Sequence, residues 1–351
     1  MNGHSVAAHP DQTMAPPATV DALPRTVFQT LPYLMAYRRH FGAGRTFYHF
    51  RAGGAGAAFL MTRGRSARRL EWWGAGIHDI GAAAYDSPSA AQNLWTRIEN
   101  LATQGHAAQL AQIPADCKLV DLAAQAGWQV CDAEACPSLI LPDNWDDYVR
   151  SLGKNMREQI KRYPKRLEKE FALEYQLAEN DDEVQSALTD LFQLHGKRWR
   201  ARGQTGVLAT PRRQKFYREV CREFARRDWL RLWTLRCDGR PACVLLSYFY
   251  GGKYSFFIGG FEPELLRWSV GTCLFARVLR HAIEEGATEF DFLRGEEEYK
   301  YRFGAVNRDY KTIAWFEDTT RGKLLQRRIE LKAAFMQRVH QKFSAVHRSK
   351  E

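Results

Sequence analysis

Residues 253–293 place two strand-like runs on either side of a helix: KYSFFIGGFEPELLRWSVGTCLFARVLRHAIEEGATEFDFL. The first run, 254–259, ends at two glycines, and the second, 289–293, follows a helix that the apolar spacing predicts over 272–285. A strand, a helix and a second strand in this order are typical of an α/β unit whose helix covers the sheet. The helix begins beside Gly271, which leaves room for a ligand near the free amides of the first turn.

The same pattern occurs twice along the chain. In the second half, strands are expected over 229–237, 242–250 and 254–259, with glycine-containing turns between them. The first half has three similar short runs over 46–51, 57–62 and 69–73, followed by a helix over 90–101 and a strand over 108–113. We therefore predict an α/β (α+β) protein of two similar modules, each a mixed twisted sheet flanked by helices. Two unrelated α+β domains are the alternative.

The length and composition agree with two domains. The chain has 351 residues, of which 45% are hydrophobic, and no apolar run long enough to span a membrane. We expect a flexible tail over 1–23, modules over 24–145 and 146–320, and a basic helix over 321–351. The tail has neither Lys or Arg nor the apolar run of a signal peptide, so a cytoplasmic location is expected. The seven cysteines show no CxxC spacing, so we expect neither a metal site nor a disulfide framework.

The formal net charge is +11, and nearly all of the excess lies in residues 146–351. Such a charge suits a phosphate-bearing cofactor, nucleic acid or an anionic membrane surface, while a solubilising surface charge is the simpler explanation. The segment 154–169 has a basic face and an apolar stripe, as does 321–350, and Pro164 is expected to kink or split the first of them.

A second informative stretch is 289–304, EFDFLRGEEEYKYRFG. If its start is a strand, Asp291 lies on the face opposite Phe290 and Phe292. Acids, bases and phenols then follow the end of that strand, which is where α/β folds keep their sites. A salt bridge between Asp291 and Arg294 at the strand end is the structural alternative.

Two further candidates come from helix ends. Ser269, Val270, Gly271 and Thr272 form the helix start described above, where Ser269 or Thr272 can also act simply as an N-cap. His195 lies near the end of a helix predicted over 183–199 and can serve as a general base, or can instead pack there as a structural residue.

These residues resemble a known family. Trp268-Ser-Val-Gly271 before a helix, the block from Glu289 to Gly304, and Leu194-His195 with Arg198-Trp199 are similar to the CelD-like (cellulose-biosynthesis) branch of the GNAT acyltransferase superfamily, which is related to the Fem peptidyl transferases. The resemblance covers most of the chain. One departure is clear, because the usual (Gln/Arg)-x-x-Gly-x-(Gly/Ala) loop keeps only Gly271 here and has Trp268 and Cys273 at its ends.

The resemblance implies a tandem pair of GNAT modules and an acyl-CoA donor, most simply acetyl-CoA. In GNAT folds the fourth and fifth strands splay apart, pantetheine lies in the gap, and the pyrophosphate meets the next helix start. Here 254–259 and 289–293 take the place of these strands, and Ser269, Val270, Gly271 and Thr272 take the place of the pyrophosphate loop.

We therefore expect an N- or O-acyltransferase in which an amine or hydroxyl attacks the thioester directly. Asp291 or Glu296 is the expected base, with His195 in reserve, and Tyr299 is the expected proton donor to the leaving thiolate. Arg294, Lys300 and Trp199 are expected to contact the substrate. The acceptor is a small molecule, glycan or peptide, and the resemblance links the activity to cellulose or exopolysaccharide production.

Two other hypotheses stay open. The Fem resemblance implies transfer from aminoacyl-tRNA, although the sequence has no long inserted coiled-coil arm, and nucleic acid is not our expected partner. A degenerate module that only binds a polysaccharide-synthesis protein is the second, supported by the altered glycine loop. Peripheral contact of the basic segments with an anionic membrane is compatible with any of the three.

Overall fold

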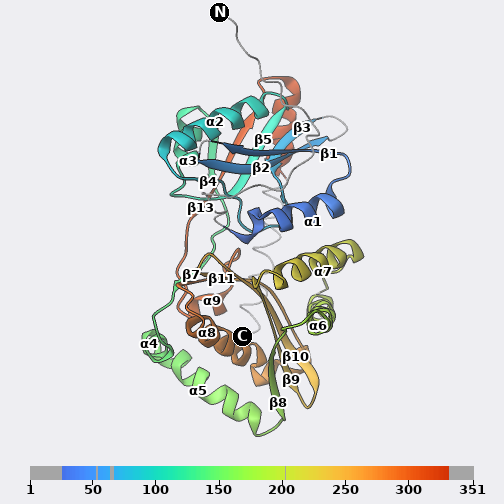
Figure 1. Cartoon of the computed structure of the whole chain (residues 1–351), viewed down its shortest axis with the longest axis vertical. Coiled ribbons are helices and arrows are strands. Elements are labelled where there is room, and N and C mark those ends of the chain that lie inside the picture. Colours follow the sequence, from blue (N-terminus) through green and yellow to red (C-terminus); the bar gives the residue numbers. More distant parts are fainter. Residues whose placement is uncertain (1–25, 53, 64–66, 202, 332–351) are drawn as a thin grey trace, which may run out of the picture.

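The computed structural model describes residues 26–331 apart from 53, 64–66 and 202. Two mixed β-sheets lie one above the other along the long axis, and helices flank both (Figure 1). The predicted fold class is therefore confirmed. The expected tail over 1–23 lies outside the described residues, as does most of the basic helix expected over 321–351, of which residues 321–331 are described and helical.

The first sheet has the strand order β1-β2-β3-β5-β13-β6, with β4 beside β2. Its strands are β1 (Arg45–Ala52), β2 (Ala55–Arg63), β3 (Arg68–Trp72), β4 (Ala84–Tyr85), β5 (Ala107–Pro114), β6 (Gln129–Asp132) and β13 (Tyr310–Phe316). Helices α2 (Pro88–Ala102) and α3 (Lys118–Gln125) share a core with one face of this sheet. Along β2, Phe59 belongs to that core, and its neighbour Leu60 points to the opposite face, towards α1 (Leu31–Phe41).

The second sheet has the order β7-β12-β11-β10-β9-β8. Its strands are β7 (Ser138–Ile140), β8 (Leu173–Leu177), β9 (Leu230–Cys237), β10 (Arg240–Tyr250), β11 (Lys253–Phe261) and β12 (Glu289–Asp291). Helices α6 (Asp181–Arg200) and α7 (Pro211–Ala225) pack on one face, and α5 (Lys154–Glu168) and α8 (Val270–Glu284) lie on the other with α4 (Trp145–Ser151). Two short 3-10 helices, η1 (Val27–Gln29) and η2 (Pro263–Trp268), and the short helix α9 (Glu298–Arg302) complete the described elements.

The helices follow from local sequence signals. Asn180 caps α6 by accepting a hydrogen bond from the Glu183 amide at 3.0 Å, and acidic residues fill the first turn of that helix while basic residues fill its last. Pro164 does not split the helix, because α5 continues through the proline and the break between helices falls at Leu152 and Gly153. The expected kink stays a prediction. Proline removes one backbone donor, but the buried stripe that includes Ile160 and Leu167 holds α5 against α8 and keeps the helix continuous.

The two halves of the chain exchange strands. Strand β7, which lies within the bounds expected for the first module, pairs antiparallel with β12 of the second sheet. In return β13, which follows the second sheet in sequence, inserts between β5 and β6 of the first. Each sheet is thus completed by residues from the other side of position 145, and the domain boundaries stay a prediction.

The halves also share a core. Helices α1 and α7 lie side by side between the two sheets (Figure 1), and one continuous cluster of buried residues includes Tyr33 of α1, Phe216 of α7 and Tyr248 of β10. The Trp73 indole N–H donates to the Leu34 carbonyl at 2.9 Å and fixes α1 to the first sheet. Burial of these large rings favours a single rigid arrangement of the two sheets.

Candidate functional site

Strands β11 and β12 form a fork. They are parallel and pair only at Lys253, Tyr254 and Ser255, which face Glu289, Phe290 and Asp291. Strand β12 ends at Asp291, whereas β11 continues to Phe261. The pairing of β10 with β11 shifts register between Leu246 and Ser247, so Phe257 forms a bulge just past the point of divergence. Among the described residues, the β12-facing edge of β11 therefore has no strand partner beyond Ser255.

The helix that follows β11 presents free amides. The first backbone bond of α8 is donated by Cys273 to the Ser269 carbonyl at 3.1 Å, so the amides of Val270, Gly271 and Thr272 have no carbonyl within the helix. Ser269 is the N-cap in a left-handed conformation with φ of 55°, and its side chain makes no capping bond. A Cβ at Gly271 would have no atom within 4 Å. The helix start is therefore open and suits an anion.

Aromatic rings close the α8 side of the fork. Phe275 of α8 packs on Phe256 of β11 at 4.8 Å and on Phe292, just after β12, at 6.0 Å between ring centroids. Tyr299 of α9 lies 5.4 Å from the same ring and is only half-buried. Burial raises the pKa of Tyr299, so its hydroxyl keeps its proton at neutral pH. The structure thus brings a phenolic donor to the fork.

Asp291 is the last paired residue of β12 and lies where the strands part. Its side chain is 4% exposed, and its Oδ1 accepts a hydrogen bond from the Leu293 amide at 2.7 Å. Burial raises its pKa to about 7, assisted by the neighbouring Glu289 carboxylate and opposed by the Leu293 hydrogen bond. Its neighbours Phe290 and Phe292 belong to the α8-side core, so Asp291 points to the α6 face of the sheet.

His195 and Trp199 have each other as partners. The Trp199 indole N–H donates to His195 Nε2 at 2.8 Å, which occupies the lone pair that a general base would use. Burial lowers the pKa of His195 to about 4. The backbone of His195 lies above the free part of β11, where α6 comes so close that a Cβ at Gly260 would be 2.7 Å from the His195 amide nitrogen. Both residues therefore anchor α6 beside the fork.

The loop after β12 is held by its own side chains and by the first half. Lys300 is 2% exposed, and its ammonium donates to the carbonyls of Leu293, Arg294 and Gly295 at 3.0–3.3 Å and contacts Glu297 at 2.9 Å. A lysine so fully satisfied stabilises the loop, and its contact with a substrate stays a prediction.

Arg294 and Glu296 also lie away from the fork. Arg294 forms ion pairs with Asp79 at 3.7 Å and Glu134 at 3.5 Å, so it connects the loop to the first half and not to Asp291. Glu296 is exposed and accepts from the Asn307 side chain at 3.2 Å. Of the predicted residues, the structure brings Asp291, Tyr299 and the helix start together around the fork.

Sequence reasoning gave no role to two further residues, one beside the fork and one beside the loop after β12. Arg198 of α6 lies over the Phe261 ring at 4.8 Å and acts electrostatically on the Tyr299 hydroxyl. Asp79, from the first half, has its pKa raised to about 6 by burial. Arg198 was visible as part of the Leu194–Trp199 motif, whereas no local pattern connects Asp79 to a loop more than two hundred residues away.

Within the described part of the chain, no cluster of three or more metal-ligating side chains occurs. None of the helices described there is both long and apolar enough to cross a membrane.

Comparison with known proteins gives a family match over part of the chain and several structures of similar fold. Residues 154–301 match the acetyltransferase (GNAT) domain family. FemX is similar in structure, with a TM-score of 0.64 and 10% identity over 84% of this chain and 93% of FemX. L-PGS from Bacillus licheniformis has a TM-score of 0.56 and 13% identity over 83% and 93% of the two chains. None of the curated proteins matches the sequence significantly.

The family match contains the fork, the start of α8 and Tyr299. It supports the GNAT part of the resemblance, whereas nothing in the comparisons distinguishes the CelD-like branch. The two structural similarities are at low identity and concern the fold.

Proposed function

We propose that this chain is an acyltransferase of the GNAT type that binds an acyl-CoA, most simply acetyl-CoA, in the fork between β11 and β12. One observation carries the proposal: the strands part after Ser255 and Asp291, beside a helix start with open amides at Gly271. The free edge of β11 can accept the amides of pantetheine, and the amides of α8 can bind the pyrophosphate. The family match over 154–301 supports this use of the fork.

The chemistry is a direct transfer. The lone pair of the acceptor amine forms a bond to the thioester carbonyl carbon, and the bond from that carbon to sulfur breaks. Unpaired amides of β11 beyond Ser255 stabilise the oxyanion. Asp291 takes the proton from the nitrogen, since its pKa of about 7 suits a base at neutral pH. Tyr299 donates its hydroxyl hydrogen to the leaving sulfur; Asp291 then releases the proton it took to solvent, and solvent returns a proton to Tyr299.

The faces on which Asp291 and Tyr299 lie give the proposal one side of the sheet for each substrate. Asp291 points to the α6 face, whereas Tyr299 packs with Phe275 on the α8 side. The acceptor therefore approaches from the side of α6 and the donor sulfur lies near α9. The link to cellulose or exopolysaccharide production and the class of acceptor rest on the sequence resemblance alone, and the cytoplasmic location rests on the composition of residues 1–23.

Calorimetric titration with acetyl-CoA, longer acyl-CoAs and free CoA tests the donor. We expect binding with a micromolar dissociation constant, and release of free thiol when an amine acceptor is added. Two variants locate the site: Gly271→Ala places a methyl group in the space proposed for the pyrophosphate and should weaken binding, whereas Gly271→Glu also puts a carboxylate among the amides and should abolish it. Absence of binding to every acyl-CoA would refute the proposal and favour a degenerate binding module.

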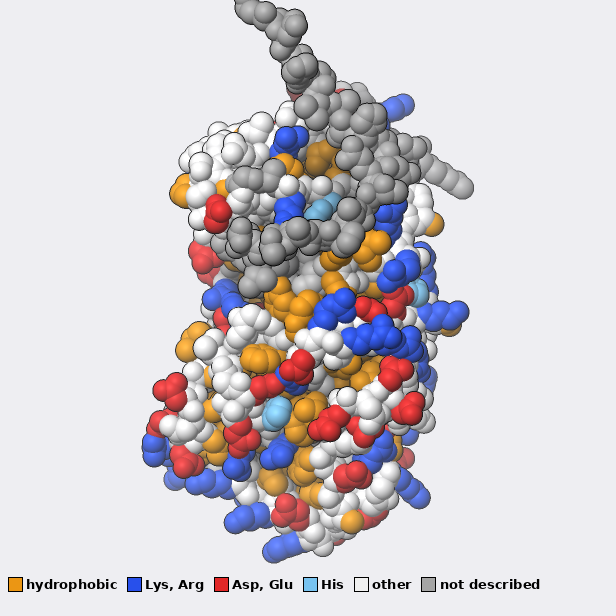
Figure 2. Space-filling model, viewed as in Figure 1, with side chains coloured by type: hydrophobic (Ala, Val, Ile, Leu, Met, Phe, Trp, Pro, Cys, Tyr) orange, Lys and Arg blue, Asp and Glu red, His pale blue; other side chains and the backbone are white. Residues whose placement is uncertain are grey.

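Transfer from an aminoacyl-tRNA is the second candidate. It is favoured by the similarity in fold to FemX and L-PGS and by the basic surface of the second half. Figure 2 shows Lys and Arg side chains along the lower left border, where α4 and α5 lie in Figure 1. Binding of a charged tRNA that weakens steeply with salt, together with no response to acyl-CoA, would select this candidate.

A further inference from the structure

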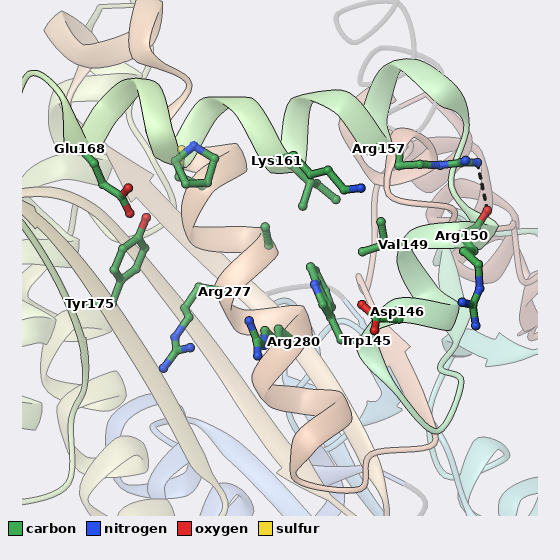
Figure 3. A pocket seen from close by; sticks show the side chains of 14 residues that line it. Trp145, Asp146, Val149, Arg150, Arg157, Lys161, Glu168, Tyr175, Arg277 and Arg280 are labelled. Carbon is green, nitrogen blue, oxygen red and sulfur yellow. Dashed lines mark hydrogen bonds between the residues drawn. The ribbon is translucent and has the colours of Figure 1, made fainter.

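A groove separate from the fork lies between α4, α5 and α8 (Figure 3). Its volume is about 760 Å³, which is in the usual range of small-molecule sites. The floor consists of buried side chains from all three helices: Val149, Ile160, Cys273 and Ala276. Trp145, Pro164 and Tyr175 add partly buried walls. The groove thus combines an apolar floor with aromatic sides.

Helix α8 separates this groove from the fork. The residues of α8 that line the groove, Cys273, Ala276, Arg277 and Arg280, recur every three or four positions and so share one side of the helix. Phe275, which packs towards β12 and Tyr299, lies on another side. A ligand in the groove would therefore leave the acyl-donor fork free.

The groove has an excess of positive charge. Five cations line it against two carboxylates: Arg150, Arg157, Lys161, Arg277 and Arg280 against Asp146 and Glu168. Three of the cations already have partners. Arg157 donates to the carbonyls of Arg150 and Leu152, Arg150 pairs with Asp147, and Arg280 pairs with Glu284.

Lys161 and Arg277 differ from these three, because neither has an ion pair with any described residue. Figure 3 shows Lys161 on α5 and Arg277 on α8, on opposite sides of the groove. The Arg277 guanidinium lies over the Trp233 ring at 5.7 Å, which holds it in place without neutralising it. The two charged ends point to different ends of the groove (Figure 3), so an anionic ligand that extends along the apolar floor can reach both.

We propose that this groove binds a nucleoside phosphate. The phosphates would lie between Lys161 and Arg277, and the base would stack on Trp145, which faces the same space (Figure 3). The carboxylates of Asp146 and Glu168 can accept hydrogen bonds from ribose hydroxyls or base amino groups. A bare phosphate would leave the aromatic walls unused, and a flat membrane surface cannot enter a groove.

Calorimetric titration of the full chain with ADP and UDP tests the proposal. It is carried out on the Gly271→Glu variant, which blocks the fork, so the result does not depend on whether the fork binds acyl-CoA. We expect binding in this background, and at least about tenfold weaker binding when Lys161→Glu and Arg277→Glu are added. The matched control is Arg162→Glu with Lys165→Glu, two charge reversals on the same helix outside the groove lining, which should leave the dissociation constant within about twofold.

A second variant separates the base from the phosphates. Trp145→Leu should weaken ADP binding and leave inorganic pyrophosphate unaffected, because only the base uses the indole. Equal binding of ADP by the groove variant and its control would overturn the proposal, as would inorganic phosphate binding as tightly as ADP. Binding of anionic phospholipid vesicles or of a single-stranded RNA oligonucleotide without any binding of ADP or UDP would overturn it as well.

Discussion

Replacing Asp291 by asparagine should stabilise the protein, and by an amount that depends on pH. The carboxyl ionises near its ordinary pKa of 3.8 in the unfolded chain and near 7 in the folded one, because burial disfavours the charge. Between these values unfolding releases a proton, so the free energy of unfolding falls as the pH rises. Relative to its value at low pH, the free energy of unfolding has fallen by about 4 kcal/mol above pH 7 and by about 1.5 kcal/mol at pH 5.

Asparagine at position 291 removes this decrease in the free energy of unfolding and keeps the local hydrogen bond. Its Oδ1 can still accept the bond from the Leu293 amide, and it has no charge to bury. Urea unfolding of Asp291→Asn should therefore show a gain over the wild type of about 4 kcal/mol at pH 8 and much less at pH 5. Asp143→Asn, at an exposed position, should change neither value. A gain of equal size at both pH values, or a loss at pH 8, would refute the reasoning.

The same variant should lose activity. If Asp291 is the base, wild-type turnover rises as the pH passes through about 7, because only the ionised carboxylate accepts a proton. Asp291→Asn should lower turnover about 10²- to 10⁴-fold with little change in the affinity for acyl-CoA. A catalytic role for Asp291 would explain why the protein keeps a buried carboxyl group that lowers its free energy of unfolding.

Three further predictions concern the fork and its loop. Tyr299→Phe should lower turnover at least about tenfold without changing donor affinity, as measured by thiol release and calorimetry, and unchanged turnover would exclude the phenol as proton donor. Gly271→Glu should keep the thermal midpoint of the free protein and remove the upward shift that acetyl-CoA causes, whereas a retained shift would place the donor elsewhere. Lys300→Met should cost about 3 kcal/mol in urea unfolding because three loop carbonyls lose their donor, and a cost below about 1 kcal/mol would contradict the structural role of Lys300.

The sequence predicted what depends on local patterns. The glycine turns and alternating apolar residues located β9, β10 and β11 to within a few residues, and apolar spacing located α8. The helix α7 was missed because its basic residues obscure the stripe that includes Phe216 and Phe224.

Pairing between strands could not be predicted in the same way. The residues of a strand show that the strand is buried, but they do not show which sheet edge it pairs with. The sequences of β7 and β13 therefore did not indicate that each joins the sheet of the other half. For the same reason Lys300 and Arg294 resembled substrate ligands in sequence. In the structure Lys300 donates to loop carbonyls and Arg294 pairs with Asp79, and these partners come near only when the chain folds.

The exchange makes the fork depend on residues from the first half of the chain. The amide of Phe292 donates to the Pro137 carbonyl and that of Gly295 to the Ala135 carbonyl, so the loop after Asp291 is held by the segment that leads into β7. A fragment that starts at residue 146 would lose these partners and leave β12 as an open edge.

The matching fragment that ends at residue 145 would lose β13 and separate β5 from β6. We expect each fragment alone to aggregate or stay unfolded, as measured by circular dichroism and gel filtration, and the two expressed together to associate and regain acyl-CoA binding. A folded, monomeric fragment 146–351 that binds acyl-CoA would show that the fork forms without the exchanged strand. In that case the donor site would be complete without the first half of the chain, and the first half would contribute only to binding of the acceptor.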